Sequence, residues 1–461
     1  MQALRLSDEK KKFYGTICKI AIPVILQNMI TMGVNLMDTI MLGSYGEVQL
    51  SGSSLANEFI NIFHILCMGM GGGAAVLTAQ YWGAKDIPSL KKSITIMLRF
   101  CVALAALFTA VTFFFPEVIM GVFTKEADVI AKGVLYLRIS AFCYIFMGLS
   151  LTLSIVLRSV RQAKVPMYMA IAAFFVNIFF NWVFIFGKLG APEMQIEGAA
   201  LGTLIARITE AGILVVYLFK YDTKIKYRIK DLFAKCGDLV KVYFRYSLPV
   251  IGSDGLLALG NSMVAVIGGH ISKEFVAANA IIALVVRLTT VFNQGISIAS
   301  STLTGNTLGA GDKERAYREG KSMIFLSFCA GVFAALLVFA LTPTILGMYN
   351  ITEETLAIAK ELMYAVIVMV VFQALQSVTT KGVLRGGGDT LFLMVADVLF
   401  LWCASVPLGY CVALVWKLPP FWVYISLKID WIIKSLWCLY RFRTRKWMRV
   451  VKREGAGAAK A

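Results

Sequence analysis

The stretch from Pro23 to Gly43, PVILQNMITMGVNLMDTIMLG, has the length of a membrane-spanning helix and carries an acid inside it. Four polar residues recur in it at steps of four, four and three, which is the spacing of one helix face. They are Gln27, Thr31, Asn35 and Asp38. A polar stripe with a carboxylate is unfavourable in a membrane unless it faces water, an ion or a protein partner. We therefore expect a cavity along this stripe and a bound cation at Asp38.

The composition of the whole chain is that of an all-α polytopic membrane protein. Of its 461 residues, 59% are hydrophobic and 16% are charged, and the mean hydropathy is +0.75; soluble proteins carry about 25% charged residues. The net charge of +18 is assigned to loops that orient helices and contact anionic lipid, so no nucleic-acid partner is expected. The nine Cys show neither a pairing pattern nor metal-ligand spacing, and no cleaved signal peptide is predicted.

Apolar runs predict twelve membrane-spanning helices. Their limits are 16–42, 53–80, 94–115, 134–156, 166–187, 196–219, 246–269, 276–304, 322–345, 361–380, 391–416 and 420–440. With a cytoplasmic N-terminus, the two tails and the even-numbered connections hold 32 Lys and Arg, and the outer connections hold 6. The positive-inside rule then places both termini in the cytoplasm, with the protein in the plasma (inner) membrane.

The chain reads as two copies of a six-helix unit. TAQYWGAKD at Thr78–Asp86 aligns without a gap with TGNTLGAGD at Thr304–Asp312, at an offset of 226. Two further pairs stand at offsets of 226 and 227: Ile22–Pro23 with Leu248–Pro249, and Leu157–Arg158 with Leu384–Arg385. Both copies have the same orientation, which predicts a parallel repeat with the substrate site between the halves and alternating access by rocking.

The longest basic connection separates the two copies. We predict an N-terminal six-helix lobe at 1–219, a cytoplasmic linker at 220–245 with an amphipathic segment on the lipid surface, and a C-terminal six-helix lobe at 246–461 that ends in a basic tail.

This ordered set of motifs resembles the prokaryotic branch of the multidrug and toxic compound extrusion (MATE) family. The set comprises TAQYWGAKD, TGNTLGAGD, LRGGGDT after the tenth span and VNIFFNWVFIFG in the fifth. The resemblance covers roughly residues 15 to 440. It implies a V-shaped pair of six-helix bundles that exports organic cations and other amphiphiles. It also implies that the inward flow of sodium ions or protons drives export.

In prokaryotic members of that family, an acid in the first helix and polar residues in the fifth form a cation site. Asp38 matches the acid, and Asn177 and Asn181 match the polar residues, although some members carry an acid at the position of Asn181. These three are candidate Na⁺ ligands, with Asn35 as a further coupling residue. A lone carboxylate in low dielectric takes up a proton instead, so Na⁺ and H⁺ coupling both stay open. Plain hydrogen bonding between helices is the alternative role for the two amides.

The second half lacks an equivalent of this acid. At the offset of 226 the position of Asp38 is occupied by Val264. Some relatives carry acids in their seventh and tenth helices, where this chain has Asp254, about one turn away from the expected position, and Gln373 with Gln376. A C-terminal ion site therefore stays open.

Five residues are assigned to the substrate cavity. They are Gln27, Thr31, Asp254, Gln373 and Gln376. Two charged pairs, Arg207 with Glu210 and Asp430 with Lys434, have the spacing that lets a helix neutralise its own charges. Asp397 is assigned a structural role.

Two other classes of function compete with a drug exporter. A flippase for a lipid-linked saccharide needs several cavity bases for a diphosphate, and the candidates are Arg99, Arg138, Arg207 and Arg287. A membrane-embedded enzyme needs a nucleophile with a base or a metal cluster, and two distant His residues supply neither. We expect a monomeric transporter without catalytic activity and without a cofactor beyond its coupling ion.

Overall fold

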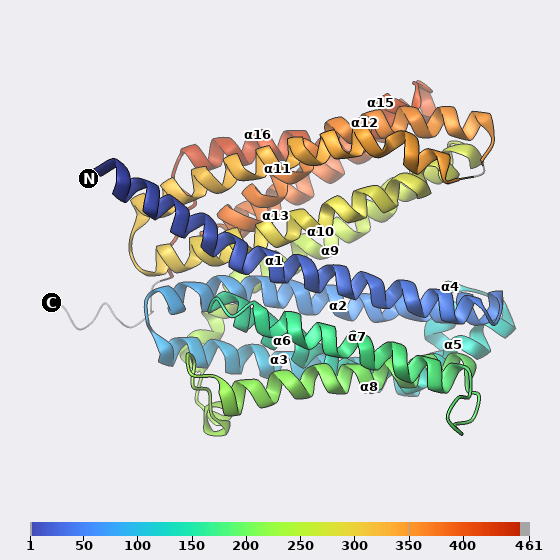
Figure 1. Ribbon diagram of the computed structural model, residues 1–461, viewed down its shortest axis with the longest axis horizontal. Helices are drawn as coiled ribbons and strands as arrows, with labels where there is room; N and C mark the ends of the chain where they lie inside the picture. The colour runs from blue at the N-terminus through green and yellow to red at the C-terminus, as the bar shows by residue number, and fades with distance from the viewer. Residues whose placement is uncertain (1, 350, 452–461) are drawn as a thin grey trace. The chain divides into compact units, whose positions relative to one another are not determined.

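The computed structural model describes residues 2–349 and 351–451, and this part of the chain is helical without a strand (Figure 1). Ten of the described helices are long and apolar enough to cross a membrane, and a bent pair adds an eleventh. The first six predicted spans correspond to α1 (Gln2–Gly43), α2 (Glu47–Gly83), α3 (Ile87–Phe114), the pair α5 (Ala127–Ser140) and α6 (Cys143–Ser159), α7 (Lys164–Ile185) and α8 (Gln195–Val216). The short helix α4 (Pro116–Phe123) precedes α5.

The other six spans correspond to α9 (Gly237–Gly269), α10 (Lys273–Gly309), α11 (Lys313–Gly347), α12 (Glu353–Ser377), α13 (Thr390–Phe400) with α14 (Val406–Tyr410), and α15 (Pro420–Leu427) with α16 (Ile429–Arg443). The twelfth predicted span is broken at Lys428, so neither α15 nor α16 alone has the length of a membrane helix. The fourth span is bent by 56° between α5 and α6.

The chain divides into two compact units, which we call the N-terminal unit and the C-terminal unit. The N-terminal unit contains Ile22–Thr78 and Asp86–Phe244. The C-terminal unit contains the described residues from Arg245 onward, together with the chain up to Ala21 and the segment Ala79–Lys85. The lobe boundaries predicted from the sequence and the V-shaped arrangement stay predictions.

The predicted linker lies along α3 within the N-terminal unit. Lys91 forms a 2.8 Å ion pair with Asp231, and the Thr95 and Tyr227 hydroxyls are 2.6 Å apart. Burial raises the pKa of the Asp231 carboxyl, but hydrogen bonds from Lys91 and from a backbone N–H outweigh burial and hold that pKa below its usual value. The polar side of the linker is therefore fixed to α3.

Glycines allow the end of α2 to touch the end of α10 within the C-terminal unit. A Cβ atom added to Gly83 would lie 2.0 Å from the Asn306 carbonyl oxygen, and one added to Gly309 would lie 2.0 Å from the Gln80 carbonyl oxygen. Because these residues are related by the offset of 226, the contact is reciprocal, as it is across a two-fold axis. Only glycine permits so close an approach.

The substitution Gly309→Ala is expected to destabilise the protein by roughly 1–3 kcal/mol, since the new methyl group overlaps the Gln80 carbonyl. Thermal unfolding in detergent measures the change. Gly255→Ala is the matched control, because a Cβ there has no heavy atom within 4 Å. A melting temperature that drops equally in both variants would contradict this account of the contact.

Candidate functional site

A chain of hydrogen bonds connects the acid of α1 to α7 and α8 inside the N-terminal unit. Asn181 Nδ2 donates to Asp38 Oδ1 at 2.5 Å and to Asn177 Oδ1 at 3.3 Å. Asn177 Nδ2 donates in turn to Thr203 Oγ1 at 3.5 Å. The structure thus brings together the three residues that the sequence named as Na⁺ ligands, and it adds a hydroxyl from α8.

Small residues on α8 bring its backbone close enough to α7 to position this chain. A Cβ on Gly202 would lie 2.1 Å from Asn181 Oδ1, and a Cβ on Gly198 would lie 2.6 Å from the Phe184 carbonyl. Asn177 and Asn181 are 1% and 0% exposed, so the packing holds both amides out of solvent. Close helix packing at glycines four residues apart is common in membrane proteins.

The Asn181 side chain has an unused acceptor. Its Oδ1 is buried and makes no hydrogen bond within the described part of the chain. A buried amide oxygen without a partner is unfavourable by about 1–3 kcal/mol. Because the two ends of an amide have nearly the same shape, a half-turn of this side chain would present Oδ1 toward Asp38. Two amides, a carboxylate and a hydroxyl would then form a set of hard oxygen ligands.

Two further polar groups lie near Asp38 and were missed by the sequence analysis. Tyr136 on α5 interacts electrostatically with Asp38, and Asn57 Nδ2 on α2 donates to the Tyr136 hydroxyl at 3.4 Å. Neither stands out in the sequence, because Asn57 is followed directly by Glu58 and Tyr136 lies two residues before Arg138.

Asn35 does not join the site. It is exposed on α1, and no hydrogen bond connects its side chain to Asp38 in the described residues. The polar stripe therefore divides: Asp38 turns toward α7, while Gln27 is buried and accepts a hydrogen bond from Arg158 of α6 at 2.6 Å.

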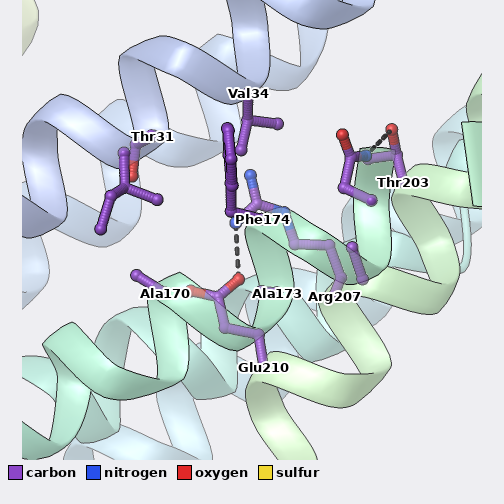
Figure 2. Close-up of a pocket in the computed structure, with 11 residues that line it drawn as sticks. Thr31, Val34, Ala170, Ala173, Phe174, Thr203, Arg207 and Glu210 are labelled. Carbon is purple, nitrogen blue, oxygen red and sulfur yellow. Dashed lines mark hydrogen bonds and ion pairs between the residues drawn. The ribbon is translucent and has the colours of Figure 1, made fainter. Parts of the chain in front are cut away.

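A small cavity of about 40 Å³ lies beside the site, lined by α1, α7 and α8 (Figure 2). Thr31 and Phe174 contribute to its wall. The assignment of Thr31 to a substrate cavity stays a prediction. Arg207 and Glu210 form the predicted pair on the same lining, at 2.7 Å. Pockets for drug-sized ligands measure about 300–1,000 Å³. This cavity therefore has room for a few water molecules beside the site and is too small for an organic substrate.

The polar residues assigned to the substrate cavity in the second half are held by their own neighbours. Asp254 lies 3.5 Å from Arg385 and 3.8 Å from Lys381. Gln373 accepts a hydrogen bond from Thr289 at 3.1 Å and donates to Thr290 at 2.7 Å. Gln376 accepts one from Thr380 at 3.3 Å. Their assignment to a substrate cavity stays a prediction.

The predicted pair of Asp430 and Lys434 is present at 2.8 Å, and it is part of a larger group. Lys434 also lies 3.3 Å from Asp397 on α13. Ser253 and Ser405 donate to the two carboxylates at 2.7 and 2.9 Å. All three charged residues are almost fully buried, so this group joins α9, α13 and α16 in the interior of the C-terminal unit.

Among the described residues, no three His, Cys, Asp or Glu side chains gather as a metal site. The oxygen donors at Asp38 carry a single negative charge, which suits a monovalent cation or a proton better than a divalent metal.

A comparison with protein families identifies the chain. The MatE family model matches residues 23–183 and again residues 249–411. The chain belongs to the MatE family. Because the second match begins 226 residues after the first, the predicted internal duplication is confirmed.

Several curated relatives of this MatE protein come from bacteria. It is 26% identical over 441 residues to "Probable multidrug resistance protein NorM" from Thermotoga maritima, covering 95% of this chain and 94% of the relative. It is 24% identical to "Multidrug resistance protein PmpM" from Pseudomonas aeruginosa, covering 90% of this chain and 86% of the relative. With its apolar helices, these bacterial relatives make it a multi-pass protein of the plasma membrane.

Solved structures share the fold of this MatE protein. A MATE protein in complex with MaL6 superposes with a TM-score of 0.84 at 19% identity, covering 94% of this chain and 96% of the other. A transporter from Pyrococcus furiosus, described as having a reversed polarity of its binding pocket, gives 0.83 at 18% identity with the same coverage. The all-helical fold of two six-helix bundles is thereby confirmed.

The substitution Gly202→Ala is expected to impair the site without changing any of its polar residues, since the new methyl group displaces the Asn181 amide. Export coupled to an ion gradient should fall about tenfold, the effect of about 1.4 kcal/mol. Transport in proteoliposomes measures it. Gly212→Ala on the same helix, where a Cβ has no heavy atom within 4 Å, should transport normally; equal losses in both variants would contradict the proposed packing.

Proposed function

We propose that this protein is a secondary multidrug efflux transporter that exchanges organic cations and amphiphilic drugs for inward-moving Na⁺ or H⁺. Membership of the MatE family and the multidrug-resistance names of its relatives support the export of drugs. Asp38 would be the coupling site. The proposal also includes a monomer with both termini in the cytoplasm and alternating access between its two halves.

The observation that carries the proposal is the surroundings of Asp38. Its carboxylate accepts a hydrogen bond from the neutral amide of Asn181, and that amide has a buried oxygen with no partner among the described residues. A carboxylate inside a membrane protein that is held by an amide gains from binding a cation, because the cation removes an uncompensated charge. Arg207 interacts with Asp38 electrostatically, but its charge is already paired with Glu210.

The two candidate ions use the same residues differently. Na⁺ requires several oxygen ligands, which Asn177, Asn181 and Thr203 supply once the Asn181 amide turns. A proton requires only the carboxylate of Asp38. In both cases, binding changes the charge beside the cavity by one unit, and moving one charge across the membrane potential is worth about 2.3 kcal/mol per 100 mV. That energy is sufficient to bias an equilibrium between two orientations of the transporter.

The lipid-linked saccharide flippase is supported less well by the same structure. Three of its four candidate bases are engaged elsewhere: Arg99 donates to two linker carbonyls, Arg138 pairs with Glu117, and Arg207 pairs with Glu210. A diphosphate would find no excess of positive charge on the described cavity lining, because Arg207 and Glu210 neutralise each other.

The substitution Asp38→Asn is expected to reduce ion-driven efflux of a fluorescent cationic dye about tenfold or more, since an amide does not bind Na⁺ or H⁺ at the coupling site (about 1.4 kcal/mol per factor of ten). The measurement is dye efflux from proteoliposomes with Na⁺ and pH gradients imposed separately. The gradient that drives the unmodified protein identifies its ion.

Asn181→Asp is the complementary variant. It places a second carboxylate beside the first and should lower the ion concentration needed for half-maximal transport. Asn35→Ala is the control, because Asn35 lies outside the hydrogen-bonded site. Undiminished efflux by the Asp38→Asn protein at equal amounts in the membrane would refute the role given to Asp38.

A further inference from the structure

Arg158, near the end of α6, carries a buried charge without a counter-ion. The residue is 9% exposed, and its Nη2 donates to Gln27 Oε1 at 2.6 Å. Its Nε is buried and has no acceptor, and no Asp or Glu of the described chain pairs with it. The guanidinium keeps its proton under all ordinary conditions, so the interior of the N-terminal unit holds a fixed positive charge at this point.

A purely structural connection between α6 and α1 does not need this charge. A buried ion whose partner is missing is strongly destabilising, whereas apolar residues of similar size are often neutral or stabilising at such positions. Ionisable residues inside membrane segments are therefore functional candidates. The structure of this chain offers an internal comparison, because the other six-helix unit carries the related arginine.

The related arginine, Arg385, has a counter-ion. It lies 3.5 Å from Asp254 on α9. Its Nε also lacks an acceptor, but its charge is met by a carboxylate. At the repeat offset of 226, Ser253 and Asp254 correspond to Gln27 and Asn28. The N-terminal unit thus has an amide, Asn28, at the position where the C-terminal unit has the acid Asp254. The counter-ion is missing because the two copies differ in sequence at this position.

The position of Arg158 relates this charge to the cation site. Gln27, its partner, lies one helical turn from Thr31, whose hydroxyl donates to the Gln27 carbonyl at 3.0 Å and which lines the cavity beside Asn177. On the side away from this cavity, α6 ends at Ser159, one residue after Arg158, and the chain continues into the predicted cytoplasmic connection. Arg158 therefore lies between the cavity and the predicted cytoplasmic end of the N-terminal unit.

The charged groups around this end are mostly basic. Arg161 and Lys164 follow Arg158 in the chain, and Lys224 from the linker donates to the Val160 carbonyl at 3.2 Å. Asp222, an acid in this region, accepts hydrogen bonds from backbone N–H groups of the linker, at 2.7 Å from that of Ile225. Its carboxylate is thus engaged by the linker backbone.

We propose that Arg158 is an electrostatic barrier that stops cations in the Asp38 cavity from passing through the interior of the N-terminal unit to the cytoplasm. Fixed arginine charges exclude cations and protons from narrow pores in the same way. A cation bound at Asp38 can then leave only when the transporter changes its orientation, which keeps ion flow coupled to export. This inference rests on the proposed cation site, and its test is designed to separate the two.

The test measures the passive leak of H⁺ and Na⁺ into proteoliposomes under an imposed membrane potential, without any drug. Arg158→Met removes the charge, and Gln27→Glu keeps the shape and the acceptor but adds the missing counter-ion. Both should raise the leak roughly tenfold, because each removes the repulsion of one unit charge in a medium of low dielectric. Arg158→Lys keeps the charge and should leave the leak at the level of the unmodified protein.

A structural role predicts a different pattern. If Arg158 only connects α6 to α1, Gln27→Glu strengthens the connection by an ion pair, so the leak stays low and the melting temperature does not fall. That result would overturn the barrier, and it is obtained even if Arg158→Met fails to fold. Arg385→Met is the matched control, because the barrier assigns no such role to an arginine that already faces the carboxylate of Asp254. An equal leak through this variant would also overturn the proposal.

The double variant of Asp38→Asn with Arg158→Met separates the barrier from the coupling site. If both proposals hold, removal of the Asp38 charge suppresses the leak that Arg158→Met opens. A leak that persists in the double variant contradicts the role of Asp38 and supports the barrier. If the leak stays at the level of the unmodified protein in both Arg158→Met and Gln27→Glu, the barrier is overturned. The dye-efflux test of Asp38 is unaffected by that result.

Discussion

The arrangement of the N-terminal unit depends on one contact, the hydrogen bond from the Asn181 amide to the Asp38 carboxylate at 2.5 Å. An acid inside a membrane helix bundle requires a partner, and a neutral amide orients it without cancelling its charge. The glycine positions of α8 follow from this requirement, because Gly202 leaves space for the Asn181 side chain. Under the proposed coupling, close packing and weak compensation hold this acid in place and leave it available to a cation.

The duplicated scaffold shows how two copies of one fold acquire different electrostatics. The position of Asp38 holds Val264 in the second copy, where the buried charges are instead paired in the group around Lys434. Arg158 faces an amide, while Arg385 faces a carboxylate. Helix packing requires small residues and apolar faces in both copies, but it does not fix charge. The two copies can therefore differ in charge, and under the proposed coupling only the N-terminal copy uses its charges in transport.

Residue spacing predicted contacts that lie within one helix, whereas the contact between Asp38 on α1 and the amide of Asn181 on α7 was expected from the family resemblance. Spacings of three and four residues correctly paired Arg207 with Glu210 and Asp430 with Lys434, because helix geometry alone brings such residues together. The twelve apolar runs and the repeat likewise gave the fold. Residues 131 positions apart, such as Arg158 and Gln27, meet only through tertiary packing, about which periodicity carries no information. Asn35 shows this limit. It shares a helix face with Asp38, yet it is exposed while Asp38 contacts α7, because the neighbours of a helix face change along the helix.

The charges in the interior of the N-terminal unit suggest why a cation and a cationic drug would exclude each other. Arg207 and Glu210 cancel, and the fixed charge of Arg158 is opposite to that of an empty, ionised Asp38. The empty unit is therefore close to neutral inside, and a cation at Asp38 leaves it with one positive charge. A positively charged substrate is disfavoured by that charge and tolerated without it. Under the proposed coupling, exchange rather than co-transport follows from the number and sign of the charges on Asp38, Arg158, Arg207 and Glu210.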